Sequence, residues 1–146
     1  MAANKPLFIV DASVVLKWFL EENDDKAEAM TLGESYLNKD IEFEMLDYTI
    51  AEIFNTMVLK LDRKKALSAL SHLFTFNILQ CNVTLEIASQ AAELMGKYKG
   101  ISFYDAGYHA LAKLEDGTFI TADEKYYKKT HKEGNIMLLK NYGKKR

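Results

Sequence analysis

Apolar residues recur along the chain in two patterns, a short continuous run and a longer stretch with helical spacing. The short runs are rich in β-branched and aromatic residues, which is typical of buried strands. The spaced stretches are typical of helices with one buried face. The short runs predict strands at 7–10, 42–46, 79–83, 118–121 and 135–139. The spacing predicts helices at 12–20, 25–38, 50–61, 63–74, 85–98, 103–114 and from about Glu124.

Strands that alternate with helices predict a parallel sheet that helices cover on both faces. We therefore expect an α/β fold with three layers, α/β/α, around a central parallel sheet. No segment rich in glycine, serine or proline divides residues 1–146, so we expect a single domain. In sheets of this kind, functional groups gather outside the carboxyl ends of the strands.

The composition points to a globular protein of the cytoplasm. Hydrophobic residues make up 49% of the 146 residues, yet no apolar run is long enough to span a membrane. The first residues, MAANKPL, do not resemble a signal peptide. The one cysteine, Cys81, lies in an apolar stretch, and we expect a small buried side chain rather than a nucleophile.

Charge is distributed unevenly along the chain, although the net charge is only −2. Residues 21–52 contain eleven acids and two bases, whereas residues 124–146 contain two acids and eight bases. The basic segment is either a solvated surface or a binding surface for a polyanion. Its candidate contacts to an RNA backbone are Lys125, Lys128, Lys129, Lys132, Lys144, Lys145 and Arg146.

Four carboxylates follow predicted strands: Asp11, Glu52, Asp105 and Asp123. Each has an ordinary explanation as a helix cap, because Asp11 and Asp123 stand at helix starts and the other two lie three residues after a hydroxyl residue. Thr49 and Glu52 have the spacing of a capping box. Glu52 also lies nearly opposite the apolar stripe of its helix, so we expect its side chain in solvent.

Taken together, the four acids predict a metal site. In a parallel sheet all four would lie near the same edge, where their mutual repulsion would raise their pKa values. Mg²⁺ or Mn²⁺ removes that penalty, since both ions prefer carboxylate oxygens. Two such ions are a known device for phosphodiester hydrolysis. The histidines have no zinc-like spacing, and we expect structural or surface roles for His72, His109 and His131.

Neighbouring residues argue against other folds that begin with an acid after the first strand. A haloacid-dehalogenase-type phosphatase needs a second aspartate where this chain has Ser13, and no P-loop or glycine-rich dinucleotide motif is present. Ser13 and Thr121 lie two residues from Asp11 and Asp123. Their hydroxyls are suited either to orienting a carboxylate or a metal-bound water, or to local turn bonding.

Four segments in order, DASVVLKWF, YTIAEIFN, YDAGYHALA and TADEKYYK, resemble the PIN-domain family. The resemblance is greatest to the VapC-type ribonuclease toxins and runs from about Phe8 to Leu139. On this resemblance Asp11, Glu52, Asp105 and Asp123 match the family's acids, and Ser13 and Thr121 match its small polar positions. Gly107 departs from the pattern, since a larger apolar residue is commoner there.

The resemblance implies a Mg²⁺- or Mn²⁺-dependent endoribonuclease, usually a homodimer, with an antitoxin that blocks the active site. Asp11, Asp105 and Asp123 would hold the metal, and Glu52 would complete the site. Three alternatives stay open: a housekeeping PIN nuclease that processes RNA or acts on DNA, a metal-free PIN-like binding module, and a small-molecule phosphatase.

Further residues have two interpretations each. Lys17 is either a phosphate contact or, more simply, a solvated helix lysine, and Trp18 fits a core or dimer face better than a base-stacking platform. Two apolar segments, 30–36 and 67–76, line either the core or a groove for a partner.

Overall fold

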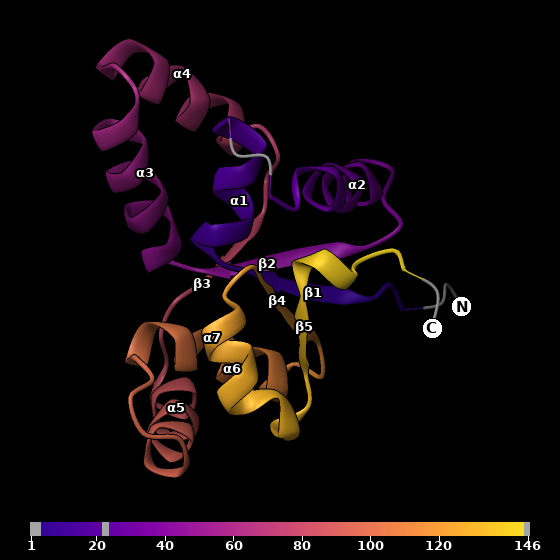
Figure 1. Ribbon diagram of the computed structural model, residues 1–146, viewed down its shortest axis with the longest axis vertical. Coiled ribbons are helices and arrows are strands. Elements are labelled where there is room, and N and C mark those ends of the chain that lie inside the picture. Colours follow the sequence, from indigo (N-terminus) through magenta and orange to yellow (C-terminus); the bar gives the residue numbers. More distant parts are fainter. Residues whose placement is uncertain (1–3, 22–23, 145–146) are drawn as a thin grey trace.

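The computed structural model describes residues 4–21 and 24–144 (Figure 1). Strands and helices alternate through most of the chain, as the apolar pattern predicts. The elements are β1 (Leu7–Val10), α1 (Ala12–Phe19), α2 (Lys26–Leu37), β2 (Glu42–Leu46), α3 (Tyr48–Lys60), α4 (Arg63–Phe74), β3 (Leu79–Cys81), α5 (Leu85–Lys97), α6 (Phe103–Leu114), β4 (Thr118–Thr121), α7 (Glu124–Thr130), η1 (His131–Glu133), β5 (Ile136–Leu138) and η2 (Leu139–Asn141).

The described strands form one parallel sheet in the order β3-β2-β1-β4-β5. Helices α1 to α4 cover one face and α5 to α7 cover the other, which gives three layers (Figure 1). The predicted α/β/α class is therefore confirmed. The chain runs outward from β1 to β2 and β3, and then returns to place β4 on the other side of β1. The strand order thus reverses between β1 and β4, and such a switch point is where α/β sheets bind ligands.

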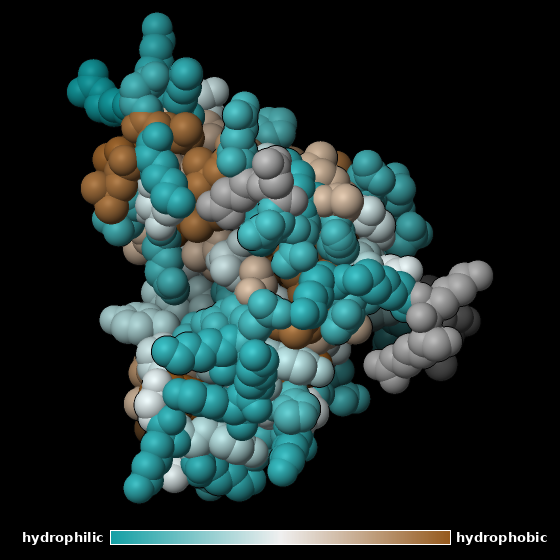
Figure 2. Space-filling view, viewed as in Figure 1, coloured by the Kyte–Doolittle hydropathy of each residue, from teal (hydrophilic) through white to brown (hydrophobic). Residues whose placement is uncertain are grey.

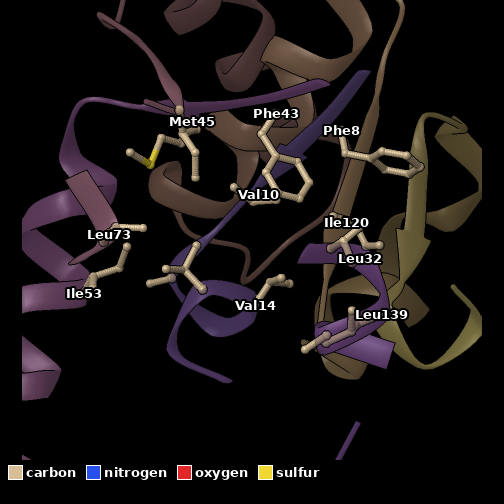
Figure 3. Packing of buried hydrophobic residues seen from close by; sticks show 14 of the residues in the cluster. Phe8, Val10, Val14, Leu32, Phe43, Met45, Ile53, Leu73, Ile120 and Leu139 are labelled. Atoms are coloured by element: carbon tan, nitrogen blue, oxygen red, sulfur yellow. The ribbon is translucent and has the colours of Figure 1, made fainter. Parts of the chain in front are cut away.

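Two apolar clusters hold the layers together, one on each face of the sheet. The first joins the sheet to α1, α2, α3 and α4, and its side chains interdigitate around Val10, Phe43 and Ile120 (Figure 3). The second joins the sheet to α5, α6 and α7, with Ile9 and Phe119 at its centre. Alternate residues of the central strands therefore face opposite layers, and both faces of β1 are buried, as expected for an internal parallel strand.

Side chains cap several helices where the sequence predicts them. Asp11 accepts a hydrogen bond from the Val14 N–H at the start of α1, and Asp123 accepts one from the Tyr126 N–H at the start of α7. The Ser102 hydroxyl accepts one from the Asp105 N–H at the start of α6. The cap interpretation of these positions is thus confirmed.

The capping box predicted at Thr49 and Glu52 is wrong. Helix α3 begins at Tyr48, two residues earlier than the apolar spacing indicates, and no side chain caps it. Thr49 therefore lies inside the first turn, where its hydroxyl hydrogen-bonds the Tyr108 hydroxyl at 2.9 Å. Thr49 thus contacts α6 instead of capping α3.

The edge strands are shorter than predicted. Strand β3 ends at Cys81 rather than Val83, and β5 ends at Leu138, after which Leu139 enters a 3₁₀ turn. Cys81 is half-buried rather than enclosed, because β3 is an edge strand, and desolvation raises the pKa of its thiol. A raised pKa disfavours the thiolate, which agrees with a structural cysteine. Within residues 4–21 and 24–144, no helix is both long and apolar enough to cross a bilayer.

Gly107 lies where α6 meets α3. A Cβ at this position would clash with the Tyr48 hydroxyl oxygen. That hydroxyl donates a hydrogen bond to the carbonyl oxygen of Tyr104 at 2.6 Å, and its ring packs edge-on against Tyr104 and Tyr108. A larger residue at this position would displace Tyr48, so Gly107 accommodates a tyrosine that bridges the two helices.

We expect the Gly107→Ala variant to be less stable by about 1–3 kcal/mol, since the tyrosine must move despite the better helix propensity of alanine. The matched control is Gly96→Ala on α5, where nothing lies within 4 Å of the added methyl group. That variant should gain up to about 1 kcal/mol. Urea denaturation measures both, and equal stabilisation by the two substitutions would contradict this role of Gly107.

Candidate active site

Asp11 occupies the switch point of the sheet, directly after β1. Asp11 is only 5% exposed to solvent. The Oδ1 atom accepts hydrogen bonds from the Ser13 hydroxyl at 2.6 Å and the Val14 N–H at 3.2 Å, and Oδ2 accepts one from the Thr121 hydroxyl at 2.7 Å. Burial nevertheless raises the pKa of Asp11 to about 6, since these hydrogen bonds offset desolvation only in part.

Ser13 and Thr121 connect Asp11 to the segment that contains Asp123. The Ser13 hydroxyl accepts a hydrogen bond from the Ala122 N–H at 3.1 Å, and the Thr121 hydroxyl accepts one from the Asp123 N–H at 3.1 Å. Each hydroxyl thus donates a hydrogen bond to the Asp11 carboxylate and accepts one from a backbone N–H of the turn between β4 and α7. Both residues orient a carboxylate, which is one of the two roles that the sequence suggests.

Asp105 and Asp123 line a shared pocket between the starts of α6 and α7. Both are half-buried. Desolvation raises the pKa of Asp105, and the charge of Asp123 raises it further, with the Ser102 hydroxyl acting in the opposite direction. The two aspartates therefore line the same pocket, and the charge of one affects the ionisation of the other.

Glu52 lies on α3 and is not in open solvent as predicted. It is half-buried, and its Oε1 atom accepts a hydrogen bond from the Tyr108 hydroxyl at 3.0 Å. Desolvation and the charge of Asp105 raise its pKa, although the Tyr108 hydrogen bond lowers it. The solvent prediction failed because it considered only the stripe of α3 itself, whereas α6 brings Tyr108 against the opposite side.

Asp105 interacts electrostatically with each of the other three acids. Its charge raises the pKa of Asp11 and of Glu52, and the charge of Asp123 raises the pKa of Asp105. In residues 4–21 and 24–144, however, no three acidic, histidine or cysteine side chains converge closely enough to hold one ion as they stand. The structure therefore brings the carboxylates to one edge of the sheet without closing them around a single point.

The donor set fits a hard divalent cation. All four side chains offer carboxylate oxygens, which suit Mg²⁺ or Mn²⁺ and not the softer metals. The Asp11 carboxylate accepts three hydrogen bonds and keeps one oxygen lone pair for a further ligand. Its raised pKa is expected for a buried carboxylate without a positive charge beside it. Asp11, Asp105 and Asp123 are therefore the candidate ligands.

The predicted lysines have different surroundings. Lys17 is only 6% exposed and has interactions within the protein, so its interpretation as a solvated helix lysine is wrong, and its contact with a phosphate stays a prediction. Lys125 lines the pocket of Asp105 and Asp123, whereas Lys128 is exposed on α7 outside it. Lys145 and Arg146 lie outside the described residues.

Two residues that sequence reasoning did not select hold the acids in place. Tyr108 holds Glu52, and Tyr126 holds Asp123 through its backbone N–H at 3.0 Å. Tyr126 is fixed in turn by His109, which is fully buried. The His109 Nε2 atom donates to the Gly134 carbonyl at 2.8 Å, so Nδ1 accepts from the Tyr126 hydroxyl at 2.9 Å. The structural role expected of His109 is confirmed, and its burial lowers its pKa.

The remaining histidines are surface residues as expected. His72 and His131 are exposed, and their rings pack against aromatic neighbours, Phe19 and Phe76 for the first and Tyr127 for the second. Neither approaches the acids, so the carboxylates alone define the candidate site.

The comparison with protein families agrees with this geometry. The model of the PIN domain matches residues 8–132, which is most of the chain. The chain belongs to the PIN-domain family. The matched range contains every candidate acid and both hydroxyl residues that hold Asp11. No curated protein sequence matches the chain.

Several solved structures share the fold. VapC20 of Mycobacterium tuberculosis, described as a sarcin-ricin loop cleaving toxin, has 17% sequence identity and a TM-score of 0.66, over 83% of this chain and 93% of that chain. A toxin–antitoxin complex from Klebsiella pneumoniae has 19% identity and a TM-score of 0.66, over 92% and 98%. VapBC2 from Rickettsia felis, bound to a promoter DNA fragment, has 16% identity and a TM-score of 0.66, over 90% and 96%. At these identities the likeness establishes the shared fold.

We expect the Asp11→Asn variant to be more stable than the parent protein above pH 6 when no metal is present. The folded protein holds the Asp11 proton up to a pKa of about 6, whereas an unfolded chain releases it near 3.8. Ionisation of Asp11 therefore destabilises the folded parent protein. This loss of stability is absent below about pH 3.8, grows between about pH 3.8 and pH 6, and stays constant at higher pH. The difference corresponds to at most about 3 kcal/mol.

Urea denaturation in EDTA at about pH 8 and about pH 4 measures this effect. The gain from Asp11→Asn should appear at the higher pH and vanish at the lower. Asp62→Asn is the control, because Asp62 caps α4 in the same way through the Lys65 N–H but its side chain is exposed. A destabilised Asp11→Asn variant at the higher pH would contradict the burial cost of this carboxylate.

Proposed function

We propose that this protein is a divalent-metal-dependent endoribonuclease, formed by a single PIN domain over residues 1–146, and that it is the toxin of a toxin–antitoxin pair. The observation that carries the proposal is the buried Asp11 carboxylate at the switch point, with Asp105 close enough to raise its pKa. A helix cap does not require burial or a second acid. Membership of the PIN-domain family supports nuclease chemistry.

In this proposal, Asp11, Asp105 and Asp123 hold Mg²⁺ or Mn²⁺, and Glu52 completes the site. A divalent cation there supplies activation of water and stabilisation of the charge that develops during phosphodiester hydrolysis. The protein's own part is to orient the ligands. Ser13 and Thr121 fix Asp11, Tyr108 fixes Glu52, and the start of α7 fixes Asp123. Hydrolysis of this kind leaves a 5′-phosphate and a 3′-hydroxyl.

The antitoxin partner rests on the structural neighbours, several of which are toxin–antitoxin complexes. An apolar groove of about 320 Å³ offers a place for such a partner. Both apolar segments identified in the sequence line this groove. The first contributes Met30 and Tyr36 from α2, and the second contributes His72 near the end of α4 and Phe76 in the turn after it. Trp18 of α1 also lines the groove. Trp18 packs on Phe43 and its indole N–H donates to the Ala29 carbonyl, so its ring is held in the groove wall.

The homodimer is a further part of the proposal. A brown area lies over α3 and α4 at the upper left of Figure 2. Apolar residues are exposed along both helices. They include Val58, Leu59, Leu67 and Phe74, with exposed fractions from 45% to 77%. A surface of this kind favours contact with another protein.

A matched pair of aspartate variants tests the nuclease. Purified protein is incubated with mixed RNA in Mg²⁺, in Mn²⁺ and in EDTA. We expect cleavage that requires the metal and that Asp11→Asn reduces by at least about a hundredfold, because a ligand is lost. Asp62→Asn should keep full activity, since asparagine caps a helix about as well as aspartate.

Other outcomes identify the alternatives. Equal activity of the two variants would make Asp11 a cap only. Metal-dependent cleavage of DNA but not RNA would favour another PIN nuclease. Hydrolysis of p-nitrophenyl phosphate without nuclease activity would favour a phosphatase. Folded protein with no hydrolysis and no Mn²⁺ binding would favour a binding module.

A further inference from the structure

Tyr104 is an exposed aromatic side chain directly beside a candidate metal ligand. It lies in the first turn of α6, immediately before Asp105, and 57% of the residue is exposed. Within residues 4–21 and 24–144, Phe74 is the only other phenylalanine, tyrosine or tryptophan that is more than half exposed. Phe74 belongs to the apolar surface of α3 and α4. Tyr104 instead presents its ring to solvent at the edge of the sheet where the acids gather.

Tyr48 holds Tyr104 in place without burying it. The Tyr48 hydroxyl donates a hydrogen bond to the Tyr104 carbonyl oxygen at 2.6 Å. The two rings meet edge to face, with their centroids 5.2 Å apart and an angle of 84° between their planes. Tyr48 is itself packed against Tyr108, with ring centroids 5.3 Å apart. Tyr104 therefore rests on a packed aromatic support, and its ring has little freedom left to lose when a ligand binds it.

The two tyrosines lie beside the acids on the α3 side of the site. Desolvation raises the pKa of the Tyr48 hydroxyl, and the charges of Glu52 and Asp105 raise it further, so both acids lie near this tyrosine. The pocket that Asp105 shares with Asp123 lies between α6 and α7, and Tyr104 does not line it. The exposed ring is thus a surface next to the carboxylates and distinct from their pocket.

The surroundings of Tyr104 favour a flat, uncharged ligand over an apolar protein surface. Its neighbours are polar, because Ser102 is exposed, Asp105 is half-buried and Asp47, whose charge acts on Tyr48, is exposed. An apolar partner that covered the ring would also remove water from these groups, which is unfavourable. A nucleobase stacks on an aromatic ring through its face and keeps its polar edges free.

We propose that Tyr104 is a stacking platform for one nucleobase of an RNA substrate. The inference rests on the proposed function, in which the phosphate next to this base is bound at the acids through a divalent cation. Every base has a π face, so the platform accepts any of the four bases, provided that the base is unpaired. The Tyr104 ring supplies the contact, and its hydroxyl is not required.

Binding of a short, fluorescently labelled single-stranded RNA, measured by anisotropy, tests the platform. Ca²⁺, a hard cation that prefers oxygen ligands, replaces Mg²⁺, and a denaturing gel confirms that the RNA is intact. An abasic strand of the same length and charge is measured beside it. Tyr104→Leu should weaken RNA binding by about tenfold, because a base–aromatic stack is lost, and should leave binding of the abasic strand unchanged. Tyr104→Phe should bind both strands like the parent protein.

Phe74→Leu is the matched control, since it replaces a similarly exposed ring away from the acids, and it should bind both strands like the parent protein. Equal weakening of both strands by Tyr104→Leu would show a disturbed acid site instead of a lost stack and would overturn the platform. Unchanged RNA binding by Tyr104→Leu would overturn it too, as would a parent protein that binds the RNA no better than the abasic strand.

RNA cleavage in Mg²⁺ separates this inference from the proposed function. Cleavage beside any of the overturning results leaves the nuclease standing without the platform. Binding that depends on both the Tyr104 ring and the bases, with no cleavage, would instead support the platform and contradict the proposed nuclease.

Discussion

The fold places several carboxylates near one edge of a parallel sheet, and within residues 4–21 and 24–144 no ion pair joins Asp11, Glu52, Asp105 or Asp123 to a cation. The cost is concentrated at Asp11, which lies between β1 and β4 and is almost fully buried. Three hydrogen bonds compensate for part of the lost solvation, yet the pKa of this carboxyl still rises to about 6. A protein that needed Asp11 only to cap α1 would gain from leaving it exposed, as Asp62 is at the start of α4. The burial agrees with the proposed role of Asp11 as a ligand of a divalent cation.

The surrounding structure supports this edge of the sheet from several elements. Hydroxyl groups from α1 and β4 fix Asp11, and the tyrosines of α6 and α7 fix Glu52 and Asp123. Gly107 belongs to the same support, because its missing side chain lets Tyr48 bind across α6 next to Tyr108. Lys125 and Lys129 of α7 line the same pocket as Asp105 and Asp123.

Much of this arrangement is predictable from the sequence, since it depends on local signals. The strands are short apolar runs, the helices have one apolar stripe, and acids that follow parallel strands must meet at one edge. Contacts between distant elements could not be predicted in this way. Glu52 is half-buried and accepts a hydrogen bond from Tyr108 of α6, and Thr49 bonds the same tyrosine instead of capping α3. Likewise, Lys17 is buried although its position on α1 suggests a solvated side chain. A single helical stripe contains no information about a neighbour that approaches from its other side.

The most direct test of the metal site is a crystal structure of the protein soaked in Mn²⁺, with anomalous diffraction used to locate the ion. The account predicts an anomalous peak at the carboxyl edge of β1 and β4, with carboxylate oxygens of Asp105 and of Asp11 or Asp123 within about 2.0–2.6 Å, the range of hard-cation ligands. No peak at this edge in crystals that hold Mn²⁺ elsewhere, with Asp11 still bonded only to Ser13, Val14 and Thr121, would contradict it.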